Sequence, residues 1–122
     1  MNCTLPVGNP LFSDDTRGYP EGMMDRISAE RFAEQSGVAD WHAEGDSARA
    51  RFETGSFAKG VEFVVEIGKL ADQANHHPDV GLRYPNVTVT LSTHDVSGLT
   101  QRDIDLAKQI SVAARNLDIS AE

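Results

Sequence analysis

The chain has 122 residues, 39% of them hydrophobic, and its 11 Lys and Arg against 19 Asp and Glu give a formal net charge of −8. This length and apolar content fit one small domain, and the negative charge disfavours nucleic acid and anionic lipid as direct partners because phosphate groups are repelled. Cys3 is the only cysteine, which excludes an intrachain disulfide. The sequence shows neither the basic and apolar start of a signal peptide nor the run of about 18 apolar residues of a membrane span. We therefore expect a cytoplasmic protein that is neither exported nor embedded in a membrane.

Residues 1–25 are rich in proline and glycine and show no apolar period. Such a composition predicts an extended N-terminal arm, for which disorder is one interpretation. A start site placed too far upstream of Met23 and Met24 is another. The predicted domain comprises residues 26–122.

From Ser28 onward the sequence becomes regular. Ser28 is a typical N-cap and predicts a short helix that ends at Gly37. Apolar residues then alternate with charged ones over 48–53, which is the period of two expected of a half-buried strand. Together with a strand that begins at Trp41, this segment predicts a hairpin that turns at residues 45–46.

A long helix follows, with Ser56 as its predicted N-cap. Its apolar residues form two stripes, one of Phe57, Val61, Val64, Gly68 and Ala71 and a second of Phe63, Ile67, Leu70 and Ala74. One small sheet cannot cover both stripes, so we expect one face to pack on the sheet and the other to meet a partner subunit. Pro78 disfavours a helical conformation at His77, so the helix should finish near His76.

The remaining sequence predicts two more strands and a last helix. A short strand is expected over 80–83, and a stronger one over 87–91, where Val and Leu alternate with Thr, delivers His94 at its end. Thr100 is the predicted N-cap of the last helix, whose apolar face consists of Ile104, Ala107, Ile110, Ala114 and Leu117. The order helix, two strands, helix, two strands, helix predicts an α+β fold, a four-stranded antiparallel sheet with three helices on one face.

Three of the four histidines lie beside the second predicted strand pair. His76 and His77 stand where the long helix ends, and His94 follows the stronger strand. Imidazole has an unperturbed pKa of roughly 6.5 and can give or take a proton near neutral pH, so the three side chains could form an acid/base site in one cavity. The alternative for the first two is a polar helix terminus favoured by the helix dipole. For His94 it is a strand-end histidine bonded to a loop carbonyl.

The wider spacing of polar residues is more specific than the histidines alone. It runs through Asp72, His76-His77-Pro78, Tyr84, His94 and Asp103. This pattern resembles the pterin-4a-carbinolamine dehydratases, also called 4a-hydroxytetrahydrobiopterin dehydratases, over residues 27–117 and most closely over 84–103, YPNVTVTLSTHDVSGLTQRD. The resemblance implies the same α+β architecture and a homodimer or homotetramer. It also implies a hydro-lyase without cofactor or metal, which removes water from a 4a-hydroxytetrahydropterin to give quinonoid dihydropterin in tetrahydrobiopterin recycling.

The resemblance also implies the site residues. His76, His77 and His94 are the expected catalytic residues, and Asp72 and Asp103 are expected to support them. Asp72 stands where the family commonly has glutamate, and its shorter side chain could instead be a solvated helix charge. The expected substrate contacts are Trp41, His76, His77, Pro78, Thr93, His94, Asp95 and Val96.

Two of these residues, Trp41 and Asp103, also have an interpretation as structural residues. Trp41 could stack on a bicyclic pterin or could anchor the core under the first hairpin. Asp103 lies three residues after Thr100 and could satisfy backbone donors in a capping box, a role that is compatible with a place in the site.

Two other functions remain open from the sequence. Three histidines with nearby aspartates also fit a zinc or iron hydrolase, although the chain has no His-Glu-x-x-His arrangement. A non-catalytic dehydratase-like scaffold or assembly factor is the second alternative, because a fold does not determine a function.

Overall fold

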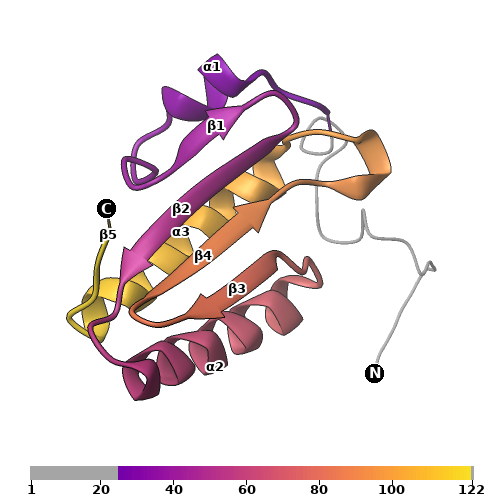
Figure 1. The fold of residues 1–122 in the computed structure, drawn as a ribbon. Helices are drawn as coiled ribbons and strands as arrows, with labels where there is room; N and C mark the ends of the chain where they lie inside the picture. Colours follow the sequence, from indigo (N-terminus) through magenta and orange to yellow (C-terminus); the bar gives the residue numbers. More distant parts are fainter. Residues whose placement is uncertain (1–24, 122) are drawn as a thin grey trace.

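The computed structural model describes residues 25–121 (Figure 1). In chain order its elements are α1 (Ala29–Ala33), β1 (His42–Glu44), β2 (Ser47–Glu53), α2 (Phe57–Ala74), β3 (Asp79–Arg83), β4 (Asn86–Leu91), a 3-10 helix (His94–Val96), α3 (Gln101–Asn116) and β5 (Ser120–Ala121). The predicted arm lies outside the described residues except for its last residue. The helix that was expected to reach Gly37 ends at Ala33, and turns that include the positive φ of Gly37 lead to β1.

All strand pairs are antiparallel, and the strand order is β1-β2-β4-β3. The α+β fold is confirmed, but the predicted strand number of four is wrong, because β5 pairs with the end of β2 and makes the sheet five-stranded. β1 pairs with residues 47–49 of β2, which leaves Phe52 and Glu53 available on the same edge for Ala121 and Ser120. A strand of two residues is too short to show an alternating pattern in the sequence.

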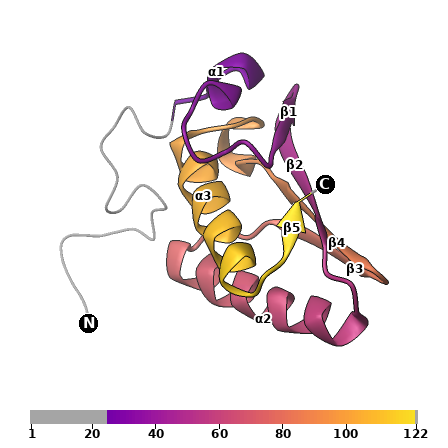
Figure 2. The same cartoon turned by 90° about the vertical axis from the view of Figure 1, so that its left-hand side faces the viewer.

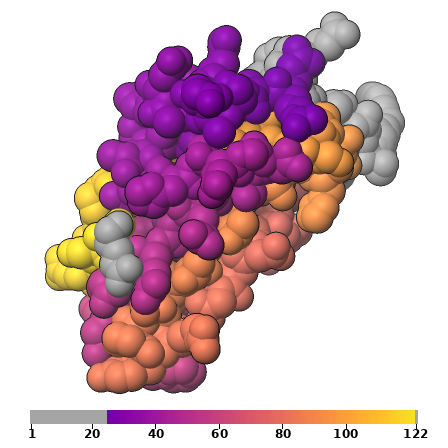
Figure 3. All heavy atoms as spheres, turned by 45° about the horizontal axis from the view of Figure 1, so that its top comes forward, coloured from indigo at the N-terminus to yellow at the C-terminus, as the bar shows by residue number. Residues whose placement is uncertain are grey.

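The helices gather on one face of the sheet, as Figure 2 shows. The inward residues of β2 and β4 alternate as predicted, and the buried ones are Ala48, Ala50, Phe52, Val87, Val89 and Leu91. Phe63 of α2 contacts Phe52 edge to face, with ring centroids 4.9 Å apart. The opposite face of the sheet is open, and strands β2 and β4 form part of the molecular surface in Figure 3. One core between the helices and a single sheet face therefore holds the fold together.

The buried residues of α2 come from both predicted stripes, Phe63 and Ile67 from one and Ala71 from the other. The exposed stripe is the first part of the latter, where Phe57 and Val61 are 52% and 41% exposed. The interpretation of the exposed stripe as an oligomer surface stays a prediction. None of the helices over residues 25–121 is both long and apolar enough to cross a membrane.

Three segments that are distant in the sequence meet where α2 ends. α2 stops at Ala74, and Asn75 follows as a left-handed C-cap with φ 51° and ψ 43°. A loop with the 3-10 helix connects β4 to α3 and is closed by the bridge between Thr93 and Gly98. α3 begins with the predicted N-cap Thr100. The exit of α2, this loop and the first turn of α3 surround the histidines.

Candidate active site

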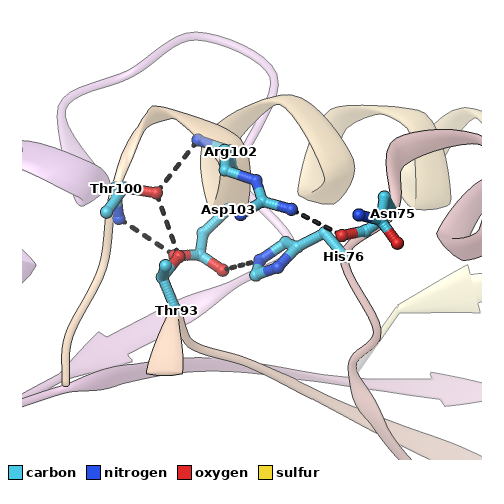
Figure 4. Close-up of polar contacts among 6 residues, drawn as sticks. All are labelled: Asn75, His76, Thr93, Thr100, Arg102 and Asp103. Carbon is cyan, nitrogen blue, oxygen red and sulfur yellow. Dashed lines mark hydrogen bonds and ion pairs between the residues drawn. The ribbon is translucent and has the colours of Figure 1, made fainter. Parts of the chain in front are cut away.

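A buried pair of His76 and Asp103 lies at the centre of the site. The ring nitrogen Nε2 of His76 is 2.6 Å from Oδ1 of Asp103, and the exposed fractions of the two side chains are 7% and 0%. Figure 4 shows the pair joining the exit of α2 to the first turn of α3. A bond this short and this well protected from water fixes the orientation of the imidazole.

The second oxygen of Asp103 is also fully used. Oδ2 accepts a hydrogen bond from the Thr93 hydroxyl at 2.7 Å and another from the Thr100 backbone N–H at 2.9 Å. The capping box predicted for Asp103 is present at the start of α3. One carboxyl group therefore both caps the helix and holds the histidine.

The order of donors around Asp103 assigns the protons. The Thr93 hydroxyl donates its proton to Asp103, so the Thr93 oxygen accepts from the Thr100 hydroxyl at 3.0 Å. The Thr100 hydroxyl oxygen in turn accepts from the backbone N–H of Arg102 at 3.2 Å. Asp103 in its carboxylate form only accepts hydrogen bonds, and in that form Nε2 of His76 carries the proton of their bond. In the neutral ring, Nδ1 is then the unprotonated nitrogen that can accept a proton.

His77 lies in a contrasting environment. Its Nε2 is 3.0 Å from Oδ1 of Asp72, and the exposed fractions of the two side chains are 61% and 81%. An exposed pair of this kind contributes little to stability. The two adjacent histidines therefore differ, because one is locked in the interior and the other can exchange protons with water.

The histidines border one pocket of about 260 Å³. Its described lining consists of Asn75, His76, His77, Thr93, His94, Asp95 and Arg102. His94 belongs to the 3-10 helix and is exposed, whereas Thr93 is buried. The three predicted catalytic histidines are thus brought together, with Thr93 and Asp95 beside them.

Other predicted site residues lie apart from this lining. Trp41 is buried in the core, where its Nε1–H donates to Ser111 at 3.0 Å and its ring meets Phe52 edge to face. Pro78 and Val96 are half-buried. They are neighbours in the sequence of the lining residues His77 and Asp95, but they do not belong to the described lining themselves. Their predicted contacts with a substrate stay predictions.

Arg102 is a site residue that the sequence reasoning missed. Its side chain is 4% exposed, lines the pocket and donates from Nη2 to the backbone oxygen of Asn75 at 2.6 Å. A hydrogen bond to a backbone carbonyl 27 positions away leaves no local pattern in the sequence. The adjacent Asp103 is the nearest signal, since the two side chains emerge from one helical turn.

Within the described residues, no group of three or more His, Cys, Asp and Glu side chains is arranged to hold a metal ion. The chemistry that the pocket offers is proton transfer, because it combines an oriented imidazole with two exposed ones.

Comparison with known proteins points to one family. Residues 25–113 match the family model described as pterin 4 alpha carbinolamine dehydratase. A candidate pterin-4-alpha-carbinolamine dehydratase of Roseiflexus sp. (strain RS-1) is 43% identical over 89 residues, which cover 72% of this chain and 96% of the relative. A candidate of the same name from Nocardia farcinica (strain IFM 10152) is 45% identical over 78 residues, covering 64% and 82%. The crystal structure of a transcriptional coactivator/pterin dehydratase from Brucella melitensis superposes with a TM-score of 0.68 at 25% identity, covering 74% of this chain and 99% of that one.

Proposed function

Because this chain belongs to the pterin-4a-carbinolamine dehydratase family, we propose that it is a hydro-lyase that removes water from a 4a-hydroxytetrahydropterin. The observation that carries the proposal is the buried pair of His76 and Asp103 beside the exposed His77 and His94 in one pocket. Such a pocket supplies one fixed proton acceptor and two groups that can hold a proton. The proposed product is the quinonoid dihydropterin.

The reaction needs two proton transfers and no redox change. The bond between the ring carbon and its hydroxyl oxygen breaks, and this oxygen takes a proton and leaves as water. The lone pair of the neighbouring ring nitrogen forms a double bond to that carbon, and the proton on this nitrogen passes to a base. The net change is loss of one water molecule, for which an acid and a base in one pocket are sufficient.

His76 is the proposed base. With its Nε2–H held by Asp103, the neutral ring presents Nδ1 as the acceptor. When the ring takes a proton, the buried carboxylate stabilises the resulting imidazolium, as it does in other histidine and aspartate pairs. This is the role for which a locked orientation matters most.

His77 is the proposed acid, because its exposed ring can be reprotonated by water between turnovers. His94 is proposed to position the pterin or to share the proton transfer from the other side of the pocket. Asp72, Pro78, Thr93, Asp95 and Val96 are proposed to support the histidines or to shape the binding loops.

The proposed setting is tetrahydrobiopterin recycling in the cytoplasm. The proposed assembly is a homodimer or homotetramer in which the exposed apolar stripe of α2, with Phe57 and Val61, contacts a second subunit. Size determination in solution, with charged residues introduced at both positions, tests the assembly separately from catalysis.

The test of the function compares rates of dehydration by stopped-flow absorbance on freshly generated substrate. The wild type is compared with the variant His76→Ala/His77→Ala and with the matched control His42→Ala, which removes an exposed histidine of β1 outside the pocket. We expect wild type and control to accelerate the reaction and the double variant to match the spontaneous rate. A double variant that is folded and fully active would remove both histidines from the mechanism.

The two alternatives predict different results in the same assay. Failure of the folded wild type to accelerate dehydration would favour a non-catalytic scaffold. Activity that disappears with a chelator and returns with added metal would favour a metal hydrolase.

A further inference from the structure

Two adjacent residues of α3 hold the same turn at two points. Asp103 binds the ring of His76, and Arg102 donates to the backbone oxygen of Asn75, the residue before it. Successive residues of a helix point about 100° apart, so the two side chains diverge from one turn (Figure 4) and reach the ring and the peptide group separately. We infer that Arg102 is a positioning residue, which sets the peptide group of Asn75 and thereby aims the imidazole of His76 at Asp103.

The peptide group between Asn75 and His76 is the point at which such a hold is needed. The N–H of this peptide group, which belongs to His76, bonds back to the carbonyl oxygen of Ala71 at 3.1 Å, and the preceding N–H of Asn75 bonds to Asp72 at 3.2 Å, so α2 itself holds one end of the group. The carbonyl of Asn75 lies beyond the last turn of the helix, and Arg102 supplies its donor from another element. The orientation of this carbonyl and the backbone angles of His76 change together, so the arginine also controls the direction of the side chain.

The placement of Arg102 is unfavourable for α3 itself. A positive charge in the first turn opposes the helix dipole, and burial of a guanidinium costs hydration free energy. An exposed polar residue would serve the helix as well or better. The bond to the carbonyl of Asn75 offsets part of these costs, and it acts on the residue directly before the histidine.

This inference rests on the proposed function for its kinetic readout, and Arg102→Gln is the first test. Arg115→Gln is the matched control, because it removes an exposed arginine from the same helix. We expect Arg102→Gln to lower kcat by about 10-fold to 100-fold, the effect of a small misplacement of a catalytic group, with KM changed by less than about threefold. The control should remain within about twofold of the wild type.

Nitrogen and proton NMR of the histidine side chains supplies a readout that does not depend on turnover. In the wild type the Nε2–H of His76, protected by its bond to Asp103, should exchange slowly with water, and in Arg102→Gln it should shift and exchange faster. An unchanged His76 signal in the folded variant would overturn the inference, whatever happens to kcat. So would an unchanged kcat in an active enzyme.

The same spectra distinguish this inference from the proposed function. If the wild type fails to dehydrate the substrate but the His76 signal changes in Arg102→Gln, the positioning role stands and the reaction is wrong. Should Arg102→Gln fail to fold, Arg102→Lys carries the test, since it retains the charge but lacks the planar guanidinium and its reach. A His76 signal and kcat that both remain at wild-type values in Arg102→Lys would then overturn the inference.

Discussion

Replacing Asp103 by Asn should move the proton of the neutral His76 ring from Nε2 to Nδ1 while keeping the shape of the site. The backbone N–H of Thr100 can only donate, so the amide oxygen of the new residue must face it, and the amide NH₂ must face His76. The ring nitrogen Nε2 then has to accept. A neutral imidazole in that state carries its proton on Nδ1, which can no longer act as the base.

The expected loss of activity is large and the loss of stability is moderate. Removal of general acid/base catalysis typically costs about 10²-fold to 10⁴-fold in rate, which corresponds to about 3 to 5 kcal/mol of barrier. The bonds from Thr93 and Thr100 persist but become bonds to a neutral oxygen, so the free energy of unfolding should fall by about 1 to 3 kcal/mol. The variant should therefore fold and bind substrate while turning it over slowly.

The assay is single-turnover dehydration combined with urea unfolding. Asp105→Asn is the matched control, because it makes the same change two residues along α3 at a half-buried site, where Oδ1 of Asp105 accepts from Gln101 at 3.0 Å. It should stay within about 0.5 kcal/mol of the wild-type stability and retain activity. Turnover by Asp103→Asn within twofold of the wild type would refute the assignment of the tautomer and of the base.

Three further pairs of substitutions test the surroundings of the site and the packing of α2 by chemical denaturation. Asn75→Ala should lower the free energy of unfolding by about 1 to 2 kcal/mol because of its left-handed backbone, whereas Asn75→Gly should be nearly neutral; equal effects would contradict this. Thr93→Val removes a donor to the buried carboxylate and should cost about 1 to 3 kcal/mol, with Thr93→Ser restoring most of it. Gly68→Ala, with open space around it, should stabilise α2 by up to about 1 kcal/mol. Gly60→Ala should gain less, because its Cβ atom would lie 2.8 Å from Cδ1 of Leu82 and this side chain must shift; an equal gain at both positions would show that the shift costs nothing.

The sequence predicted those parts of the fold that depend on neighbouring residues. The alternation of Val87, Val89 and Leu91 matched a strand with one buried face, and Ser56 and Thr100 are the N-caps of the two long helices. Each of these signals arises within a few residues, where side-chain period and capping act directly.

The parts that were missed depend on contacts between distant segments. β5 forms where Ala121 and Ser120 pair with Phe52 and Glu53 of β2, beyond the residues that pair with β1, and no local pattern of its two residues reveals this. The difference between His76 and His77 also has a distant origin, since the left-handed turn at Asn75 sends one ring toward α3 and leaves its neighbour in solvent. The histidine cluster was visible in the sequence, whereas the division of its members into a locked and an exposed ring was not.

The central claim is tested most directly by one rate, that of dehydration of a 4a-hydroxytetrahydropterin by the metal-free wild type. This rate is compared with the spontaneous rate in the same buffer with a chelator. The pocket of His76, His77 and His94 predicts a rate proportional to the concentration of the chain and well above the spontaneous one. A rate equal to the spontaneous one, from a chain that is folded by circular dichroism, would contradict the proposal that this pocket is a dehydratase site.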